Sequence, residues 1–174
     1  MRFSASLGLS VFVATMLVSA SLHAQDSKAQ NATGEMPAIL FVCEHGAAKS
    51  VIAAAYFEKL AKERGLKYRA IFRGTNPDPA LAPVAVKGLN EDGIDTSGRK
   101  PELVAKKDMD QASGIVTLGC ALPGGEVAPD KVTAWNDIPS PSQNYQAARD
   151  EIVKKVRGLV DDLAKKERKK KPRR

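Results

Sequence analysis

The sequence predicts an α/β domain over residues 37–165, because strand-like and helix-like segments alternate along it. Short apolar runs are followed by segments whose apolar residues recur every three or four positions. Turns rich in glycine and proline separate many of these segments. Such alternation is typical of a parallel sheet with helices on both faces. We therefore expect a three-layer sandwich around a short, four-stranded parallel sheet.

The expected elements follow in order from apolar spacing and from turn residues. Gly65 and Gly93 come directly after two helical segments, in the position where glycine commonly ends a helix. No internal repeat or second domain boundary interrupts the order. We expect strands at 37–42, 67–72, 113–118 and 131–135, and helices at 48–64, 80–92, within 101–112 and at 143–166.

The first residues have the pattern of a secretory signal peptide. Within residues 1–24, Arg2 is the only charge, an apolar stretch follows, and small residues precede the expected cleavage after Ala24. An uncleaved membrane anchor is the alternative. In either case we expect an exported protein, periplasmic or secreted. Residues 25–36 are polar and aperiodic, which predicts a linker.

The chain ends in a basic tail, which we place at residues 166–174. From Lys165 onward there are eight Lys or Arg residues and one Glu, a net charge of +7 that equals that of the whole chain. Such a run either contacts anionic surfaces or is simply the solvated end of a helix, which we favour. We expect no nucleic-acid partner, because the protein is expected to be exported.

The sequence offers little for a metal or a cofactor. Cys43, Cys120 and His45 do not form a metal-ligand cluster. The chain also has no Walker loop and no dinucleotide-binding fingerprint. We therefore expect neither a metal nor a cofactor.

The stretch from Ile39 to Ser50, Ile-Leu-Phe-Val-Cys-Glu-His-Gly-Ala-Ala-Lys-Ser, indicates a reactive thiol. A strand-like run ends at Cys43, a loop of mostly small residues follows, and a helix is expected to start at the end of the loop. Free N–H groups and the dipole at a helix N-terminus stabilise a thiolate, the nucleophilic form of cysteine. The same N–H groups can hold a tetrahedral oxyanion over the sulfur.

Five segments together form a more specific signature: Phe41–Ser50, Gly74-Thr75, Glu91–Ser97, Thr117–Cys120 and Trp135–Pro141. In this order and at these intervals they resemble the low-molecular-weight protein tyrosine phosphatases and the thioredoxin-type arsenate reductases, which share the phosphatase-I fold. The first segment is similar to the family's phosphate loop, Cys-x5-Arg-Ser. The resemblance covers essentially the whole domain and implies this fold.

The resemblance also implies roles for the residues of the loop. Cys43 would be the nucleophile, Ser50 would steady its thiolate, and the loop backbone would cradle an oxyanion. The family's arginine is Lys49 here, and lysine lacks the planar fork that grips two oxygens at once. We expect a loss of roughly a hundred- to thousand-fold in rate, unless Arg73 supplies a replacement guanidinium. The expected oxyanion-binding residues are Glu44, His45, Gly46, Ala47, Ala48, Lys49 and Arg73.

Other positions also depart from the family. Gly46 stands in place of an asparagine, which we expect to be mild in conformation because both residues tolerate positive φ. The family's acid, an aspartate before proline, aligns with Ser140, and a serine hydroxyl is a poor proton donor. Asp137 is the alternative acid, although it also fits an ordinary loop residue. His45 either tunes the thiolate or is a surface loop residue.

Cys120 has three interpretations. As a match to the reductases' second cysteine, it would attack the Cys43–arsenic adduct, release arsenite and leave a Cys43–Cys120 disulfide. In an exported protein, the same pair would instead form a structural disulfide that silences the loop. As a third possibility, Cys120 is a buried small residue after a core strand. The reductases' third cysteine, a few residues further on, is absent.

We therefore expect a cysteine-dependent enzyme that acts on a tetrahedral oxyanion, either arsenate or a phosphomonoester, with a slight preference for the arsenate reductase branch. Its catalytic residues would be Cys43, Lys49, Ser50, Cys120 and Asp137. A thioredoxin-like thiol reductant would be its partner in the reductase reaction. The rival hypothesis is an exported, non-catalytic module that binds an oxyanion or a partner and carries a structural disulfide.

Overall fold

The computed structural model describes residues 36–124 and 127–170. The expected signal peptide, the linker up to residue 35 and the last four residues of the basic tail lie outside these ranges.

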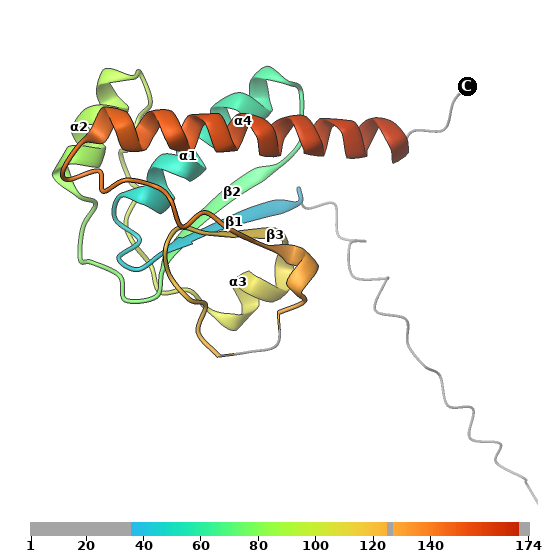
Figure 1. Ribbon diagram of the computed structural model, residues 1–174, viewed down its shortest axis with the longest axis horizontal. Helices are drawn as coiled ribbons and strands as arrows, with labels where there is room; N and C mark the ends of the chain where they lie inside the picture. Colours follow the sequence, from blue (N-terminus) through green and yellow to red (C-terminus); the bar gives the residue numbers. More distant parts are fainter. Residues whose placement is uncertain (1–35, 125–126, 171–174) are drawn as a thin grey trace, which may run out of the picture. The chain divides into compact units, whose positions relative to one another are not determined.

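A parallel sheet of four strands forms the centre of the domain, as the sequence predicts (Figure 1). The strand order is β2-β1-β3-β4, and every neighbouring pair is parallel. All six residues of the central strand β1 are buried, as expected for a strand covered on both faces. The strands are β1 (Ala38–Cys43), β2 (Arg69–Gly74), β3 (Ala112–Thr117) and β4 (Val132–Ala134).

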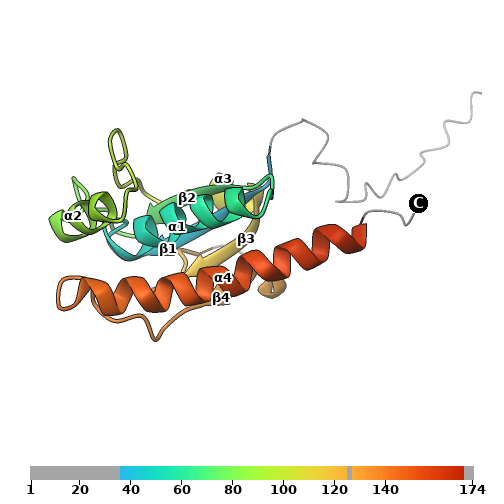
Figure 2. The ribbon, with the colours of Figure 1, turned by 90° about the horizontal axis from the view of Figure 1, so that it is seen from above.

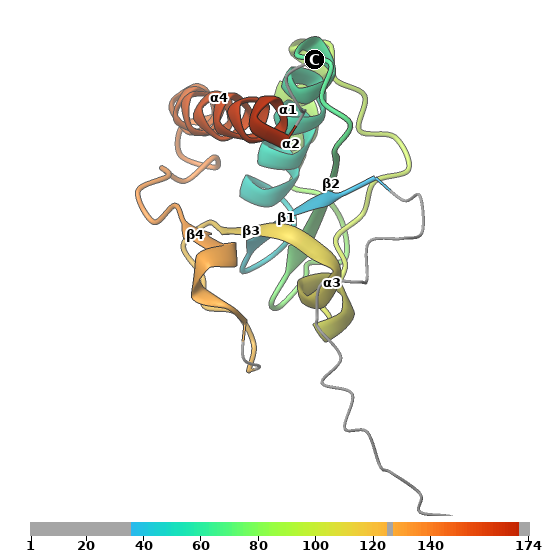
Figure 3. The ribbon, with the colours of Figure 1, turned by 90° about the vertical axis from the view of Figure 1, so that its right-hand side faces the viewer.

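Helices cover both faces of this sheet, which confirms the expected three layers. Figure 3 shows α1 and α4 on one face and α3 on the other. Seen from above, α1 and α4 lie alongside each other (Figure 2). Gly65 and Gly93, with φ of 65° and 73°, follow α1 and α2 closely, as expected of residues that end helices. The helices are α1 (Lys49–Glu63), α2 (Pro83–Glu91), α3 (Lys106–Gln111), α4 (Tyr145–Lys170) and a short 3-10 turn, η1 (Pro129–Lys131).

Alternating residues of β1 supply two separate hydrophobic cores. Phe41 and Cys43 belong to the core between the sheet and helices α1 and α4, where the Phe41 and Phe57 rings lie 5.6 Å apart. Leu40 and Val42 face the smaller core on the α3 side. The period of two along a strand produces this division, and it also places the Cys43 side chain on the α1 side of the sheet.

Helix α4 continues beyond its expected end, so that residues 166–170 of the expected tail are helical. The hydroxyl of Tyr68, just before β2, donates a hydrogen bond of 3.1 Å to Glu167 near this end. Cations in the last turn also suit the helix dipole. Within residues 36–124 and 127–170, no helix has the length and apolar character needed to cross a membrane.

Candidate active site

Strand β1 and helix α1 together position the Cys43 thiol. The strand ends at Cys43 and the helix begins at Lys49, so the intervening loop lies at a helix N-terminus. Cys43 is 6 % exposed, and its thiol donates a hydrogen bond of 3.2 Å to the hydroxyl of the fully buried Ser50. The first N–H groups of a helix have no partner within the helix, so they are available to an anion above the sulfur.

The segment after β2 holds the loop from outside through backbone hydrogen bonds. Four N–H groups in this segment donate to loop carbonyl oxygens at 2.8–3.1 Å: those of Thr75, Asn76, Asp78 and Ala82 donate to Cys43, Glu44, His45 and Ala47, respectively. Gly46 has a positive φ of 63°, in agreement with the sequence-based expectation. The space around it is tighter than that expectation implied, because a Cβ atom at Gly46 would lie 2.9 Å from the Gly74 nitrogen. Backbone contacts therefore fix the shape of the loop.

A cavity of about 270 Å³ opens beside the Cys43 thiol. Its basic side chain is Lys49, whose Nζ lies close to Gly119. His45 and Asp78 also line it, with His45 Nδ1 3.3 Å from an Asp78 oxygen. The lining residues are Cys43, Glu44, His45, Ala47, Ala48, Lys49, Asp78, Ala82, Val84, Leu118, Gly119, Ser140, Pro141 and Ser142.

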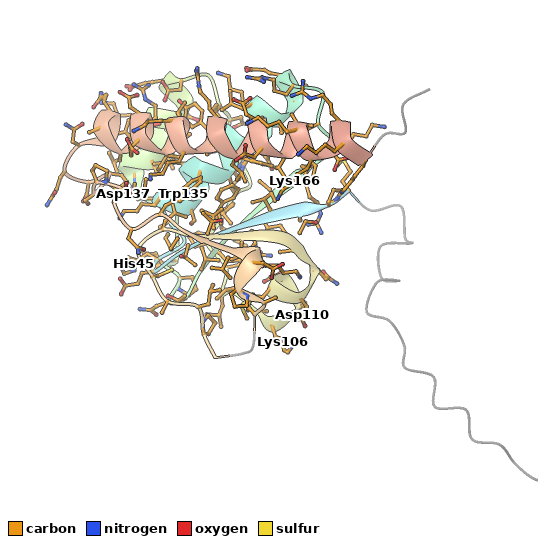
Figure 4. The ribbon with its side chains drawn as sticks, turned by 45° about the vertical axis from the view of Figure 1, so that its right-hand side comes forward. His45, Lys106, Asp110, Trp135, Asp137 and Lys166 are labelled. Carbon is orange, nitrogen blue, oxygen red and sulfur yellow. The ribbon has the colours of Figure 1, made fainter. Side chains whose placement is uncertain are left out.

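The two residues considered for the acid position have different surroundings. Ser140 lines the cavity, and its hydroxyl lies 2.8 Å from that of Ser142. Asp137 does not line the cavity but forms an ion pair of 2.9 Å with Lys155 of α4, beside which Figure 4 shows it. The hydrogen bond from Lys155 lowers the pKa of Asp137. The structure therefore holds Asp137 outside the cavity that Cys43 and Lys49 line.

Arg73 does not reach the cavity either, contrary to its expected role as a replacement guanidinium. Its guanidinium group is held by Asp108 at 3.0 Å and by Glu102 at 3.1 Å. It also donates to the carbonyl oxygen of Phe72. These contacts occupy the group on the side of α3, so Lys49 remains as the basic side chain that lines the cavity.

Cys120 lies near the site but packs on the other side of the sheet. Its thiol donates to the Val42 carbonyl oxygen at 3.4 Å, and its side chain contacts the core on the α3 side. Burial, and then the proximity of Cys43, raise the pKa of the Cys120 thiol. Both cysteines are free, so the structure does not contain the structural Cys43–Cys120 disulfide that was one of the three interpretations.

Sequence reasoning missed Asp78, Gly119 and Ser142 as cavity residues. Each follows the carboxyl end of a parallel strand, and ligands bind at that edge of such sheets. For Asp78 this rule points to the turn-rich loop after β2 but does not select the residue. In residues 36–124 and 127–170, no group of three or more His, Cys, Asp or Glu side chains is arranged to hold a metal ion.

Comparisons with known proteins agree with this fold. Residues 38–122 match the family model described as low molecular weight phosphotyrosine protein phosphatase. A protein named "Putative arsenate reductase" from Halobacterium salinarum is 27 % identical over 128 residues, which cover 71 % of this chain and 90 % of that protein.

Solved structures show the same fold at low identity. The YwlE arginine phosphatase from Geobacillus stearothermophilus is 20 % identical, with a TM-score of 0.63, over 79 % of this chain and 99 % of the phosphatase. A thioredoxin-dependent arsenate reductase from Corynebacterium glutamicum is 22 % identical, with a TM-score of 0.58, over 77 % of this chain and 63 % of the reductase.

The chain is therefore similar to the low-molecular-weight phosphatases and to the arsenate reductases that share their fold. This similarity supports an enzyme with cysteine-based phosphatase or arsenate reductase activity.

Proposed function

We propose that the protein is a phosphatase that uses Cys43 to hydrolyse phosphomonoesters. The observation that carries the proposal is the Cys43–Ser50 hydrogen bond of 3.2 Å, between a thiol that lines the cavity and the first turn of α1. A serine hydroxyl in this position stabilises a thiolate by donating to it. The N-terminal N–H groups of α1 complement the charge of a phosphate above the sulfur.

The reaction would proceed in two displacements. The Cys43 thiolate attacks phosphorus, the bond to the ester oxygen breaks, and the leaving oxygen takes up a proton. Water then attacks the phosphocysteine, the S–P bond breaks, and the thiolate is restored with release of phosphate. Lys49 would supply positive charge to the phosphoryl oxygens throughout.

Arsenate reduction is the second candidate, and the position of Cys120 favours it. The Cys120 thiol donates a hydrogen bond to the carbonyl oxygen of Val42, the residue immediately before the nucleophile. In this reaction Cys43 would attack arsenic with loss of water, and the Cys120 thiolate would then attack the Cys43 sulfur. Arsenic would be reduced and leave as arsenite, and the disulfide would be reduced by a thioredoxin-like protein. Cys120 must first move from the opposite side of the sheet, so the geometry supports the phosphatase reaction better.

One set of assays separates these functions. We would measure phosphate release from p-nitrophenyl phosphate, and arsenite release from arsenate with thioredoxin and its reductase. A phosphatase loses activity in Cys43→Ser and keeps it in Cys120→Ser, whereas a reductase loses arsenite release in both. Phosphate binding that survives Cys43→Ser, with no turnover by the wild type, would instead identify a non-catalytic binding module.

Export of the protein is part of the same proposal. It is supported by the apolar, nearly uncharged residues 1–24, which lie outside the described residues. Mass spectrometry of the protein from its native cells should find Gln25 as the first residue. An intact N-terminus in a membrane fraction would indicate an uncleaved anchor, and one in the cytoplasm would contradict export.

Contact of the basic end with anionic surfaces is the alternative to a merely solvated helix end, and a truncation separates the two. Removal of residues 168–174 keeps Glu167 and its hydrogen bond to Tyr68, so the domain should stay folded. Co-sedimentation with vesicles that contain phosphatidylserine should fall in this truncated protein. Unchanged binding would show that these charges serve only solubility.

A further inference from the structure

The cavity has no carboxylic acid at the position where the resemblance to the low-molecular-weight phosphatases places their acid. Ser140 occupies that position, and Asp137 is held by Lys155 at 2.9 Å outside the cavity. A leaving group whose anion is strongly basic departs slowly unless a positioned acid protonates its oxygen. A phosphatase with this cavity therefore needs another proton donor.

His45 and Asp78 form an imidazole–carboxylate pair within the cavity. Two contacts join them: His45 Nδ1 lies 3.3 Å from an Asp78 carboxylate oxygen, and the Asp78 N–H donates to the His45 carbonyl oxygen at 3.0 Å. The second contact fixes Asp78 beside His45 through the backbone. Both residues line the same cavity as Cys43, and Figure 4 shows His45 in the loop at this end of the sheet.

The pair leaves the other ring nitrogen available for proton transfer. The Asp78 carboxylate lies on the Nδ1 side of the ring, at the ion-pair distance of 3.3 Å, so Nε2 is the nitrogen left to gain or lose a proton. A Glu44 carboxylate oxygen lies 3.8 Å from Nε2, beyond hydrogen-bond distance. The His45 side chain is 53 % exposed, so a substrate can approach it without displacing a buried group.

We propose that His45, positioned by Asp78, is the proton donor and acceptor that replaces the missing aspartic acid; this proposal rests on the phosphatase function above. While Cys43 attacks phosphorus, the protonated Nε2 gives its proton to the leaving ester oxygen as the P–O bond breaks. In the second displacement, neutral Nε2 accepts a proton from the attacking water as the S–P bond breaks. The thiolate and the protonated imidazole are both restored, and water is the only co-reactant.

Charged groups of both signs surround His45. The Glu44 and Asp78 carboxylates lie 3.8 and 3.3 Å from its ring nitrogens, and the Lys49 ammonium group lines the same cavity. Opposite charges attract, so a Cys43 thiolate and a protonated imidazole can coexist in one cavity.

A comparison of two esters tests this role directly. The p-nitrophenolate ion leaves without a proton, whereas the phenolate ion is a much poorer leaving group. General acid catalysis contributes about 10²- to 10⁴-fold. We therefore expect His45→Gln to lower kcat/KM for phenyl phosphate by at least about 100-fold, and for p-nitrophenyl phosphate by less than about tenfold. The limb of the pH–rate profile that reports loss of the acid's proton should also disappear.

Two more variants complete the design. Asp78→Asn keeps the backbone hydrogen bond to His45 and should reproduce the same selective loss more weakly, because Asp78 positions the ring. Asp137→Asn is the matched control and should change neither ester, because its carboxylate faces Lys155. Thermal unfolding of each variant shows whether the domain remains intact.

Each outcome decides the proposal. Equal losses on both esters in a folded His45→Gln protein would assign His45 to thiolate activation and overturn the proposal. No loss on either ester, or a selective loss in Asp137→Asn instead, would overturn it as well and leave the phosphatase function standing. If the wild type hydrolyses neither ester, the proposed function fails, and the role of His45 fails with it.

Discussion

Gly46 of the oxyanion loop and Gly74 at the end of β2 lie with their backbones in direct contact. A Cβ atom on Gly46 would lie 2.9 Å from the Gly74 nitrogen, and one on Gly74 would lie 2.8 Å from the Gly46 nitrogen. Carbon atoms of real side chains are not found this close to backbone atoms. The close contact allows backbone N–H groups within residues 75–82 to form hydrogen bonds with the loop carbonyl oxygens. It therefore determines where the N–H groups around Cys43 lie.

We expect Gly74→Ala to push the loop away from β2 and to impair both stability and catalysis. Overpacking of this kind typically costs about 1–3 kcal/mol in the free energy of unfolding. Because small displacements of a loop that positions an oxyanion have large effects, kcat/KM should fall about 100-fold. Urea unfolding and p-nitrophenyl phosphate hydrolysis measure the two effects.

The control for this variant is Gly158→Ala in α4. No atom lies within 4 Å of its added Cβ, and alanine favours helix over glycine by about 0.5–1 kcal/mol. This control should gain stability and keep its activity. Wild-type behaviour of Gly74→Ala would mean that the loop shape does not depend on this contact.

Ser50→Ala tests the hydrogen bond beneath the nucleophile. Loss of a hydrogen bond to a charged group costs about 1.5–3 kcal/mol, or roughly 10- to 100-fold in rate. We expect slower phosphate release and slower iodoacetamide labelling of Cys43, because both need the thiolate. Ser113→Ala, on an exposed position of β3, is the control and should match the wild type. Unchanged labelling of Cys43 in Ser50→Ala would remove Ser50 from the mechanism.

Lys49→Arg tests whether the loop is impaired by its lysine. A guanidinium group donates to two oxyanion oxygens at once, so we expect kcat/KM to rise by about 10- to 1000-fold. Lys49→Met should lower it instead, because the charge that lines the cavity is then lost. Lys59→Arg, on an exposed position of the same helix, serves as the control. No gain in Lys49→Arg would mean that lysine already suits this cavity.

The sequence predicts the architecture well because its signals are local. Strand β1, the helices that end near Gly65 and Gly93, and the position of Cys43 at a helix N-terminus all depend on residues close together in the chain. Ion pairs between residues that are distant in the sequence cannot be predicted in this way. Arg73 and Asp137 have suitable charges near the site, but Asp108 and Lys155, 35 and 18 residues away in sequence, hold them elsewhere.

The position of Cys120 shows a second limit of sequence reasoning. Its place after β3 correctly predicts the edge of the sheet on which it lies, yet it does not predict the face. Gly119, immediately before it, has a positive φ of 75°, and Cys120 contacts the core on the α3 side. Turn geometry of this kind depends on the tertiary contacts of the loop.

Asp92, which follows α2, joins three helices through its carboxylate. It accepts hydrogen bonds from the hydroxyls of Tyr56 and Tyr145 at 2.7 and 3.0 Å, and from Arg149 at 2.8 Å. Burial alone would raise the pKa of Asp92, but these hydrogen bonds and the Arg149 charge outweigh it and lower the pKa below the ordinary value of 3.8. Burial, and then Asp92, raise the pKa of Tyr56 to about 12.

We expect Asp92→Asn to lower the free energy of unfolding at pH 7 by about 2–3 kcal/mol, because hydrogen bonds to a charged group are lost. Since the folded state lowers the pKa of Asp92, its contribution is complete above pH 3.8 and is lost as the pH falls through the lower, folded value. In urea unfolding, the difference in the free energy of unfolding between wild type and variant should therefore be constant from pH 7 to 5 and decrease below pH 4. Asp110→Asn, whose carboxylate pairs with Lys106 on the surface of α3, should change stability by less than about 0.5 kcal/mol. A gap for Asp92→Asn that stays constant down to pH 2 would show that the carboxylate charge does not stabilise the fold.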